Sequence, residues 1–95
     1  MSYVNPANVY SPRRSIEPGS VKVLLDKGEG SFSIASLKWD GRPCIGIRWN
    51  GKNNNTGSPQ SRGNPTWFIL PQEIALSYAD SIGNIEMKAI IERAK

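Results

Sequence analysis

Tryptophan and arginine are the residues of this chain best suited to chemistry, and that chemistry is binding. Trp39 and Arg42 flank a predicted turn, and Arg48 follows six residues later. Single-stranded nucleic acid is bound by this combination, because bases stack on aromatic rings while the backbone phosphates meet cations. Each stacked base contributes about 1–3 kcal/mol. The pattern favours a surface that meets an anionic partner.

Residues for catalysis or metal binding are sparse. The sequence has no histidine and one cysteine, Cys44, so the commonest general base and metal ligand at neutral pH is missing. Cys44 in a strand is expected to pack as a small apolar group. Four of the eight acidic residues, Asp26, Glu29, Asp40 and Glu73, could form a carboxylate-only active site, but their spacing gives no indication that they converge. We therefore expect a protein that is not an enzyme and uses no cofactor or metal.

The net charge of +4 is concentrated in one part of the chain. Residues 41–72 contain no acidic residue and four cations: Arg42, Arg48, Lys52 and Arg62. A surface of one sign favours phosphate-rich or acidic partners. Plain solubility is the alternative explanation of the surplus.

The elements that must position these residues centre on residues 31–50. This stretch predicts two strands joined at Asp40-Gly41, because Asp-Gly supplies the two positive-φ positions of a tight hairpin turn. Pairing outward from the turn places on one face Ser33, Ala35, Leu37, Trp39, Arg42, Cys44, Gly46 and Arg48, here called the arginine face. The isoleucine face, opposite, carries Phe32, Ile34, Ile45, Ile47 and Trp49. The second face is predicted to be core, and the first an exposed shallow shelf.

Other segments complete the predicted domain. Residues 20–27 alternate in hydropathy as a half-buried strand does, and residues 65–71 form a short strand bounded by prolines. Residues 72–82 and 85–95 carry apolar residues at helical spacing, and between them Gly83 can end the first helix while Asn84 can cap the start of the second. The predicted fold class is α+β, an antiparallel sheet of about four strands with one or two C-terminal helices packed on one face. The chain thus predicts one domain over residues 20–95.

The polar segment 51–66 has two interpretations. Long loops in small domains are commonly functional or mobile. In the first interpretation, residues 57–63 form a backbone nest that holds an anion with the help of Arg62. The second, a flexible loop that closes over a bound ligand, is favoured, because the glycines lack a phosphate-loop spacing.

Residues 1–19 also allow two interpretations. Three prolines and little periodicity indicate an extended or flexible arm, in which Arg13 and Arg14 would meet phosphate. The favoured interpretation is a tail or edge strand that covers the core.

The packing of the helices carries a prediction about assembly. One stripe of the first helix carries Ile74, Ala75, Tyr78, Ala79 and Ile82, and it is expected to rest on the isoleucine face through Ile74, Tyr78 and Ile82. Further apolar positions at Met87, Ile90 and Ile91 then have no surface to cover, which predicts a homodimer through the C-terminal helices.

A family resemblance rests on three motifs: LKWDGRP, the following IRWN, and the helix entry ILPQEIALSYADSI. Over residues 21–91 the chain resembles the positive-cofactor-four group of transcriptional coactivators and their bacterial relatives. The resemblance implies a four-stranded antiparallel sheet, dimerisation through helices and single-stranded DNA binding on the sheet, with Arg42, Arg48 and Lys52 as backbone contacts. The chain departs from the group in its long 51–66 loop and in TWFILP, where the group has a lysine-rich helix entry. It is also similar to small proteins of bacterial mobile elements and gene cassettes, which implies no function.

We therefore expect a small nucleic-acid-binding module that prefers single strands. Trp39 and Trp67 would stack bases, and phosphates would meet the cations Arg42, Arg48, Lys52, Arg62, Arg13 and Arg14. The alternative is a protein- or small-ligand-binding accessory module of a mobile genetic element, in which the small residues of the arginine face leave room for a peptide. A cytoplasmic location is expected, because there is one cysteine, no signal-peptide pattern and no apolar run near the ~20 residues of a membrane span.

Overall fold

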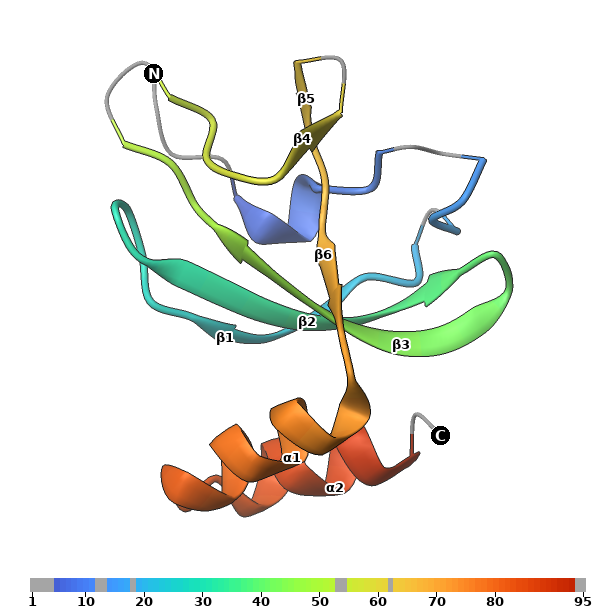
Figure 1. The fold of residues 1–95 in the computed structure, drawn as a ribbon, viewed down its shortest axis with the longest axis vertical. Helices are drawn as coiled ribbons and strands as arrows, with labels where there is room; N and C mark the ends of the chain where they lie inside the picture. Colours follow the sequence, from blue (N-terminus) through green and yellow to red (C-terminus); the bar gives the residue numbers. More distant parts are fainter. Residues whose placement is uncertain (1–4, 12–13, 18, 53–54, 62, 94–95) are drawn as a thin grey trace.

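The computed structural model describes residues 5–11, 14–17, 19–52, 55–61 and 63–93. The fold is α+β, as predicted: a four-stranded antiparallel sheet with two C-terminal helices on one face (Figure 1). Along the sheet the order is β1-β2-β3-β6. The sheet strands are β1 (Lys22–Asp26), β2 (Phe32–Trp39), β3 (Arg42–Trp49) and β6 (Phe68–Leu70), and the helices are α1 (Gln72–Ser81) and α2 (Ile85–Arg93).

The β2–β3 hairpin has the predicted register. Trp39 pairs with Arg42, and the ladder continues without a shift to Ser33 opposite Arg48. Asp40 and Gly41 have φ angles of 52° and 80°, which are the positive values that a two-residue turn of this kind requires. The division of residues between the arginine face and the isoleucine face is therefore confirmed.

The remaining strands are less regular. The pairing of β1 with β2 shifts register between Val23 and Leu25, an irregularity that hydropathy alternation does not reveal. β6 pairs with β3 and lies at the edge of the sheet. Two short strands, β4 (Gln60–Ser61) and β5 (Asn64–Pro65), form a separate hairpin within the segment predicted to be a flexible loop.

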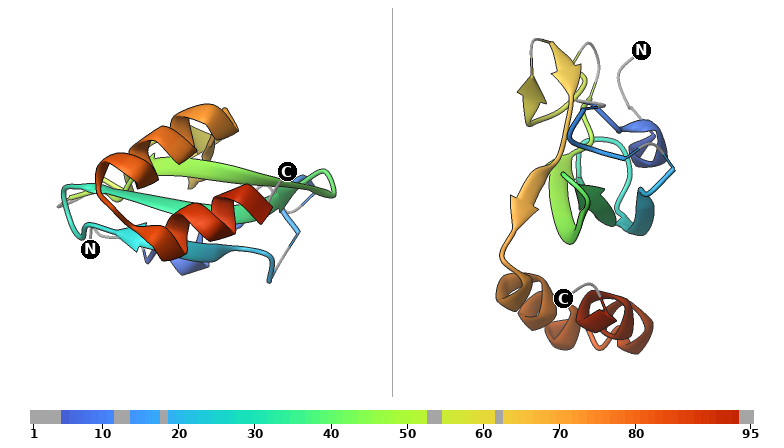
Figure 2. Two further views of the ribbon diagram at one scale, coloured as in Figure 1. Left: turned by 90° about the horizontal axis from the view of Figure 1, so that it is seen from below. Right: turned by 90° about the vertical axis from the view of Figure 1, so that its right-hand side faces the viewer.

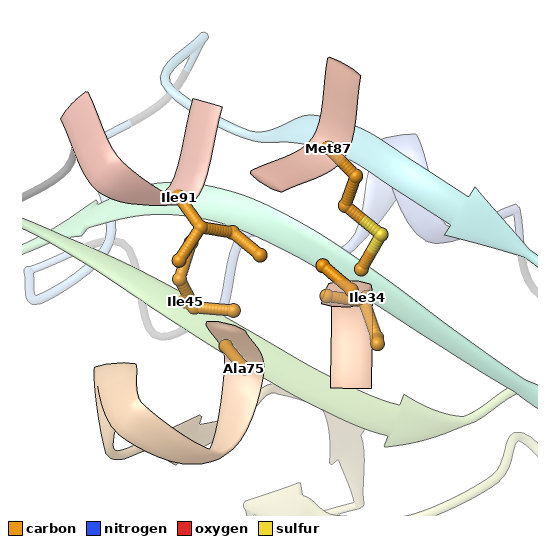
Figure 3. Close-up of a cluster of buried hydrophobic side chains, with 6 residues drawn as sticks. Ile34, Ile45, Ala75, Met87 and Ile91 are labelled. Carbon is orange, nitrogen blue, oxygen red and sulfur yellow. The ribbon is translucent and has the colours of Figure 1, made fainter. Parts of the chain in front are cut away.

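The isoleucine face forms the larger core beneath the helices. Ile34 and Ile45 are buried against Ala75, Met87 and Ile91 (Figure 3). The small side chain of Ala75 lets α1 lie close to the sheet. Apolar burial of this kind contributes about 25 cal/mol per Å² removed from water.

The start of α2 is capped as its sequence indicates. The Asn84 side-chain Oδ1 accepts a hydrogen bond from Met87 N at 2.9 Å, the usual role of an N-cap asparagine. Met87 and Ile91 are buried in the chain's own core, so they do not supply the uncovered apolar surface on which the homodimer prediction depends. The homodimer itself stays a prediction.

The arginine face is covered, so the prediction that it forms an exposed shelf is wrong. A short 3-10 helix, η1 (Pro6–Asn8), and the residues after it lie on the side of the sheet opposite the helices (Figures 1 and 2). Val9 and Ile16 are fully buried there, in a second core with Ala35, Leu37 and Trp67. The described part of the N-terminal segment therefore packs on the sheet rather than standing off as an arm.

Among the described residues, no helix combines the length and the apolar character that crossing a membrane requires.

Candidate ligand-binding groove

The helices leave one end of the isoleucine face open, and a groove of about 580 Å³ lies there. Three large apolar side chains are exposed beside it: Trp49 by 59%, Phe68 by 64% and Ile74 by 55%. The prediction that Trp49 is core is wrong. The lining is almost wholly apolar and comprises Phe32, Ile34, Ile47, Arg48, Trp49, Ser58, Pro59, Phe68, Leu70, Ile74 and Tyr78.

The groove exists because α1 meets the sheet through its alanines. Ala75 and Ala79 are fully buried, whereas Ile74, one position earlier, is turned toward the opening together with Tyr78. The prediction that Ile74, Tyr78 and Ile82 carry the contact with the sheet is therefore wrong in detail, since Ile74 and Ile82 are both exposed. The predicted stripe is real, but its centre is rotated on the helix.

Three aromatic side chains that line the groove contact one another. The ring of Phe32 meets Tyr78 at a centroid distance of 5.9 Å and Trp49 at 6.3 Å, both edge to face. Such pairs contribute about 0.5–1.5 kcal/mol beyond their burial. The Trp49 ring is thus exposed to solvent but held by its contact with Phe32, so the groove is largely pre-formed.

A second, more polar hollow of about 380 Å³ adjoins the groove. Both linings include Trp49 and Ser58, so these two residues border both spaces. The other lining residues of the polar hollow are Gly30, Ser31, Gly51, Lys52, Asn55 and Gly57. Among the described residues, neither lining contains a carboxylate.

Arg48 holds the loop that borders both spaces. Its side chain is 2% exposed, and its Nη1 donates to the carbonyl oxygens of Thr66 at 2.6 Å and Pro59 at 3.4 Å, while Nη2 donates to that of Thr56. Desolvation by burial lowers the pKa of this guanidinium. Within the described residues, Arg48 Nε and Thr66 Oγ1 have no hydrogen-bond partner. The guanidinium is thus committed to backbone carbonyls rather than presented to a phosphate.

A close backbone approach ties the same loop to the end of β3. Trp49 N donates to Ser58 O at 2.7 Å, and Ser58 N donates to Trp49 O at 3.2 Å. Gly57 makes this possible, because its φ is 91° and a Cβ there would overlap the Trp49 carbonyl oxygen. The result places Ser58 and Pro59 against the groove.

A polar network fixes the turn between β1 and β2 beside the polar hollow. Ser33 Oγ lies 2.6 Å from Asn50 Oδ1, and Asn50 Nδ2 donates to Gly28 O at 2.8 Å and to Asp26 Oδ1 at 3.1 Å. Asn50 and Ser33 are fully buried, so these bonds satisfy groups that water cannot reach.

No group of three or more histidine, cysteine, aspartate or glutamate side chains that could hold a metal is found in the described part of the chain.

Those predicted nucleic-acid contacts that lie within the described residues do not form one surface. Trp67 is 3% exposed and its Nε1 donates to Val9 O at 2.7 Å, so it cannot stack a base in this conformation. Trp39 is half-buried and forms a β-bridge with Ile16. Arg42 begins β3.

The remaining predicted cations that the structure describes, Arg14, Arg42 and Lys52, are dispersed. Arg42 lies at the start of β3, and Lys52 comes shortly after the other end of this strand. Both side chains are exposed, as is that of Arg14. Arg13 and Arg62 lie outside the described residues. Of the predicted residues that the structure describes, Lys52 alone borders one of the two spaces with an exposed side chain.

The residues that sequence reasoning missed are Trp49, Phe68, Ile74 and Tyr78. One signal was available, namely the lengths of the elements. The eight residues of β3 extend about 26 Å at 3.3 Å per residue. The ten residues of α1 extend about 15 Å at 1.5 Å per residue. Such a helix cannot cover the whole length of the strand.

Comparisons with protein-family models, with curated proteins and with solved structures found no match. The resemblance to the positive-cofactor-four group therefore stays a prediction.

Proposed function

We propose that this protein is a non-enzymatic binding module and that its site is the groove between α1, β3 and β6. One observation carries the proposal: Trp49, Phe68 and Ile74 are each more than half exposed around one concave space. Exposed apolar residues are ordinary when scattered singly, but their clustering marks an interaction site. A bound ligand would remove this surface from water.

The dimensions and lining of the groove favour a small apolar or aromatic ligand. Its volume of about 580 Å³ lies within the ~300–1,000 Å³ typical of small-molecule sites. Such sites combine apolar walls with a few polar groups that orient the ligand, a role that Ser58 and Tyr78 can take here.

Titration with Nile red, a neutral dye that fluoresces in apolar surroundings, tests the proposal. Ile74→Ala removes apolar contacts from the groove, and should weaken binding about fivefold for a loss of about 1 kcal/mol. Ile85→Ala is the matched control, since Ile85 is 82% exposed on a helix and does not line the groove. Absence of dye binding, or equal effects of the two substitutions, would contradict the proposal.

Single-strand nucleic-acid binding is a second candidate function, supported by the exposed rings of Trp49 and Phe68 and the nearby cation Lys52. In this version Trp49 and Phe68 replace Trp39 and Trp67 as stacking residues. Fluorescence anisotropy with labelled single strands at several salt concentrations measures it. Lys52→Ala should reduce the salt slope by about one unit, and Trp49→Ala should weaken binding at every salt concentration. No binding at low salt would exclude this function.

A further inference from the structure

We propose that the ligand is a free amphipathic anion, with its apolar body in the groove and its anionic head in the polar hollow at Lys52. This inference rests on the proposed function and names the class of ligand. The groove and the polar hollow are neighbours, because they share Trp49 and Ser58 in their linings, and an elongated molecule that passes these two residues would occupy both.

Charge complementarity identifies the head group. Lys52 places an exposed cation in the polar hollow, and no carboxylate of the described residues lines either space. Arg48 does not compete for the head group, because its guanidinium is buried on carbonyl oxygens. An anion is therefore favoured over a neutral or cationic head of the same size.

The hydrogen-bonding groups of the polar hollow agree with an anion. Asn55 Oδ1 accepts from Gly57 N at 2.7 Å, so the donor end of this exposed amide is the part left for a ligand. Lys52 and Asn55 also exchange two backbone hydrogen bonds, at 3.0 and 3.1 Å, which fixes them opposite each other. The hollow thus offers a cation and an amide donor on two residues whose backbones pair with each other.

The experiment compares ligands that share a dodecyl chain and differ in the head: dodecanoate, dodecanol and dodecyltrimethylammonium. Each is used to displace Nile red at neutral pH, the two charged ligands below their micelle concentrations and dodecanol below its solubility limit. We expect dodecanoate to bind about fivefold more tightly than dodecanol, which corresponds to one partly exposed ion pair. The preference should vanish in roughly 1 M salt, where the Debye length is ~3 Å.

Two variants locate the head group. Lys52→Met should abolish the preference for dodecanoate, while Nile red still binds. Arg42→Met is the matched control, because Arg42 is also exposed but lies at the opposite end of β3, and it should leave the preference unchanged. Circular dichroism of both variants checks that they fold.

The outcomes separate this inference from the proposed function. Equal displacement by the three ligands, or a preference that survives in Lys52→Met, would overturn the anion while leaving the groove as a site. Failure of Nile red to bind would overturn both. If the protein bound dodecanoate only within phospholipid vesicles, the proposal of a free ligand would be overturned in favour of a membrane surface.

Discussion

Replacing Arg48 with alanine removes the guanidinium that holds the loop 51–66 against β3. The side chain is 2% exposed and donates to the carbonyl oxygens of Thr56, Pro59 and Thr66. An exposed arginine whose role is to bind phosphate would be dispensable for folding. The structure instead makes Arg48 a stabilising residue.

The magnitude follows from the acceptors left behind. A buried acceptor without a partner costs about 1–3 kcal/mol. Since the bond to Pro59 is long at 3.4 Å, two carbonyls lose a full partner, those of Thr56 and Thr66. Removal of the desolvated guanidinium offsets part of this loss. We expect Arg48→Ala to lower the free energy of unfolding by about 3 kcal/mol, out of the ~5–15 kcal/mol that such domains have.

Urea unfolding monitored by tryptophan fluorescence measures the effect. With a slope of about 1.5 kcal/mol per molar, the midpoint should fall by about 2 M. The exposed Arg42 provides the control, and Arg42→Ala should change the free energy of unfolding by less than about 0.5 kcal/mol. If Arg48→Ala were as stable as the unmodified protein, the assignment of Arg48 to the loop would be refuted.

Three further predictions test other parts of the structure. Gly57→Ala should lower the free energy of unfolding by more than about 3 kcal/mol in urea, because the added Cβ overlaps a backbone oxygen of β3. Gly63 is also at positive φ but in open space, so Gly63→Ala should lower it by about 1 kcal/mol. Equal losses in the two variants would contradict this account. Trp67→Phe removes the indole hydrogen bond to Val9 and should lower the free energy of unfolding by about 1–3 kcal/mol, and unchanged thermal stability would argue against the covered arginine face. Burial raises the pKa of the Cys44 thiol, so less thiolate is present and iodoacetamide should react more slowly with folded than with urea-unfolded protein; equal rates would refute the burial. Because the pKa of Cys44 is higher in the folded than in the unfolded state, the protonated thiol favours the folded state. This contribution to stability is lost as pH rises through the folded-state pKa.

Local structure could be predicted from the sequence because neighbouring residues determine it. The Asp40-Gly41 turn fixes the register of β2 and β3, and alternation then assigns every residue of the hairpin to a face. Asn84 similarly marks the start of α2 through its own side chain.

The identity of the exposed surface could not be predicted in this way, because both faces carry apolar residues and distant segments decide which is covered. The small residues interpreted as a shelf accommodate Trp67 instead. A Cβ on Gly46 would lie 2.8 Å from Trp67 Cβ, so glycine is needed for this close packing. Ala35, paired with Gly46, is fully buried in the same core. Nothing near Gly46 in the sequence indicates that a tryptophan twenty-one residues later fills this space.

The candidate site was missed for a related reason. Alternation correctly placed Trp49 on the face that meets the helices, but it cannot say how far along the strand the helices reach. Ile74 was likewise assigned to the buried stripe, although the alanines of α1 make the contact. The length of the helix could be predicted from the sequence, but its rotation and its position over the sheet are properties of the assembled layers.

The most direct test of the binding groove is an NMR titration of the three tryptophan indole N–H groups with dodecanoate. Tryptophan-to-phenylalanine variants assign the three signals. Because Trp49 borders both spaces while Trp67 is buried on Val9, we expect the Trp49 signal to shift and the Trp39 and Trp67 signals to stay in place. Shifts of the Trp39 signal with none at Trp49 would place the ligand on the arginine face and contradict the account.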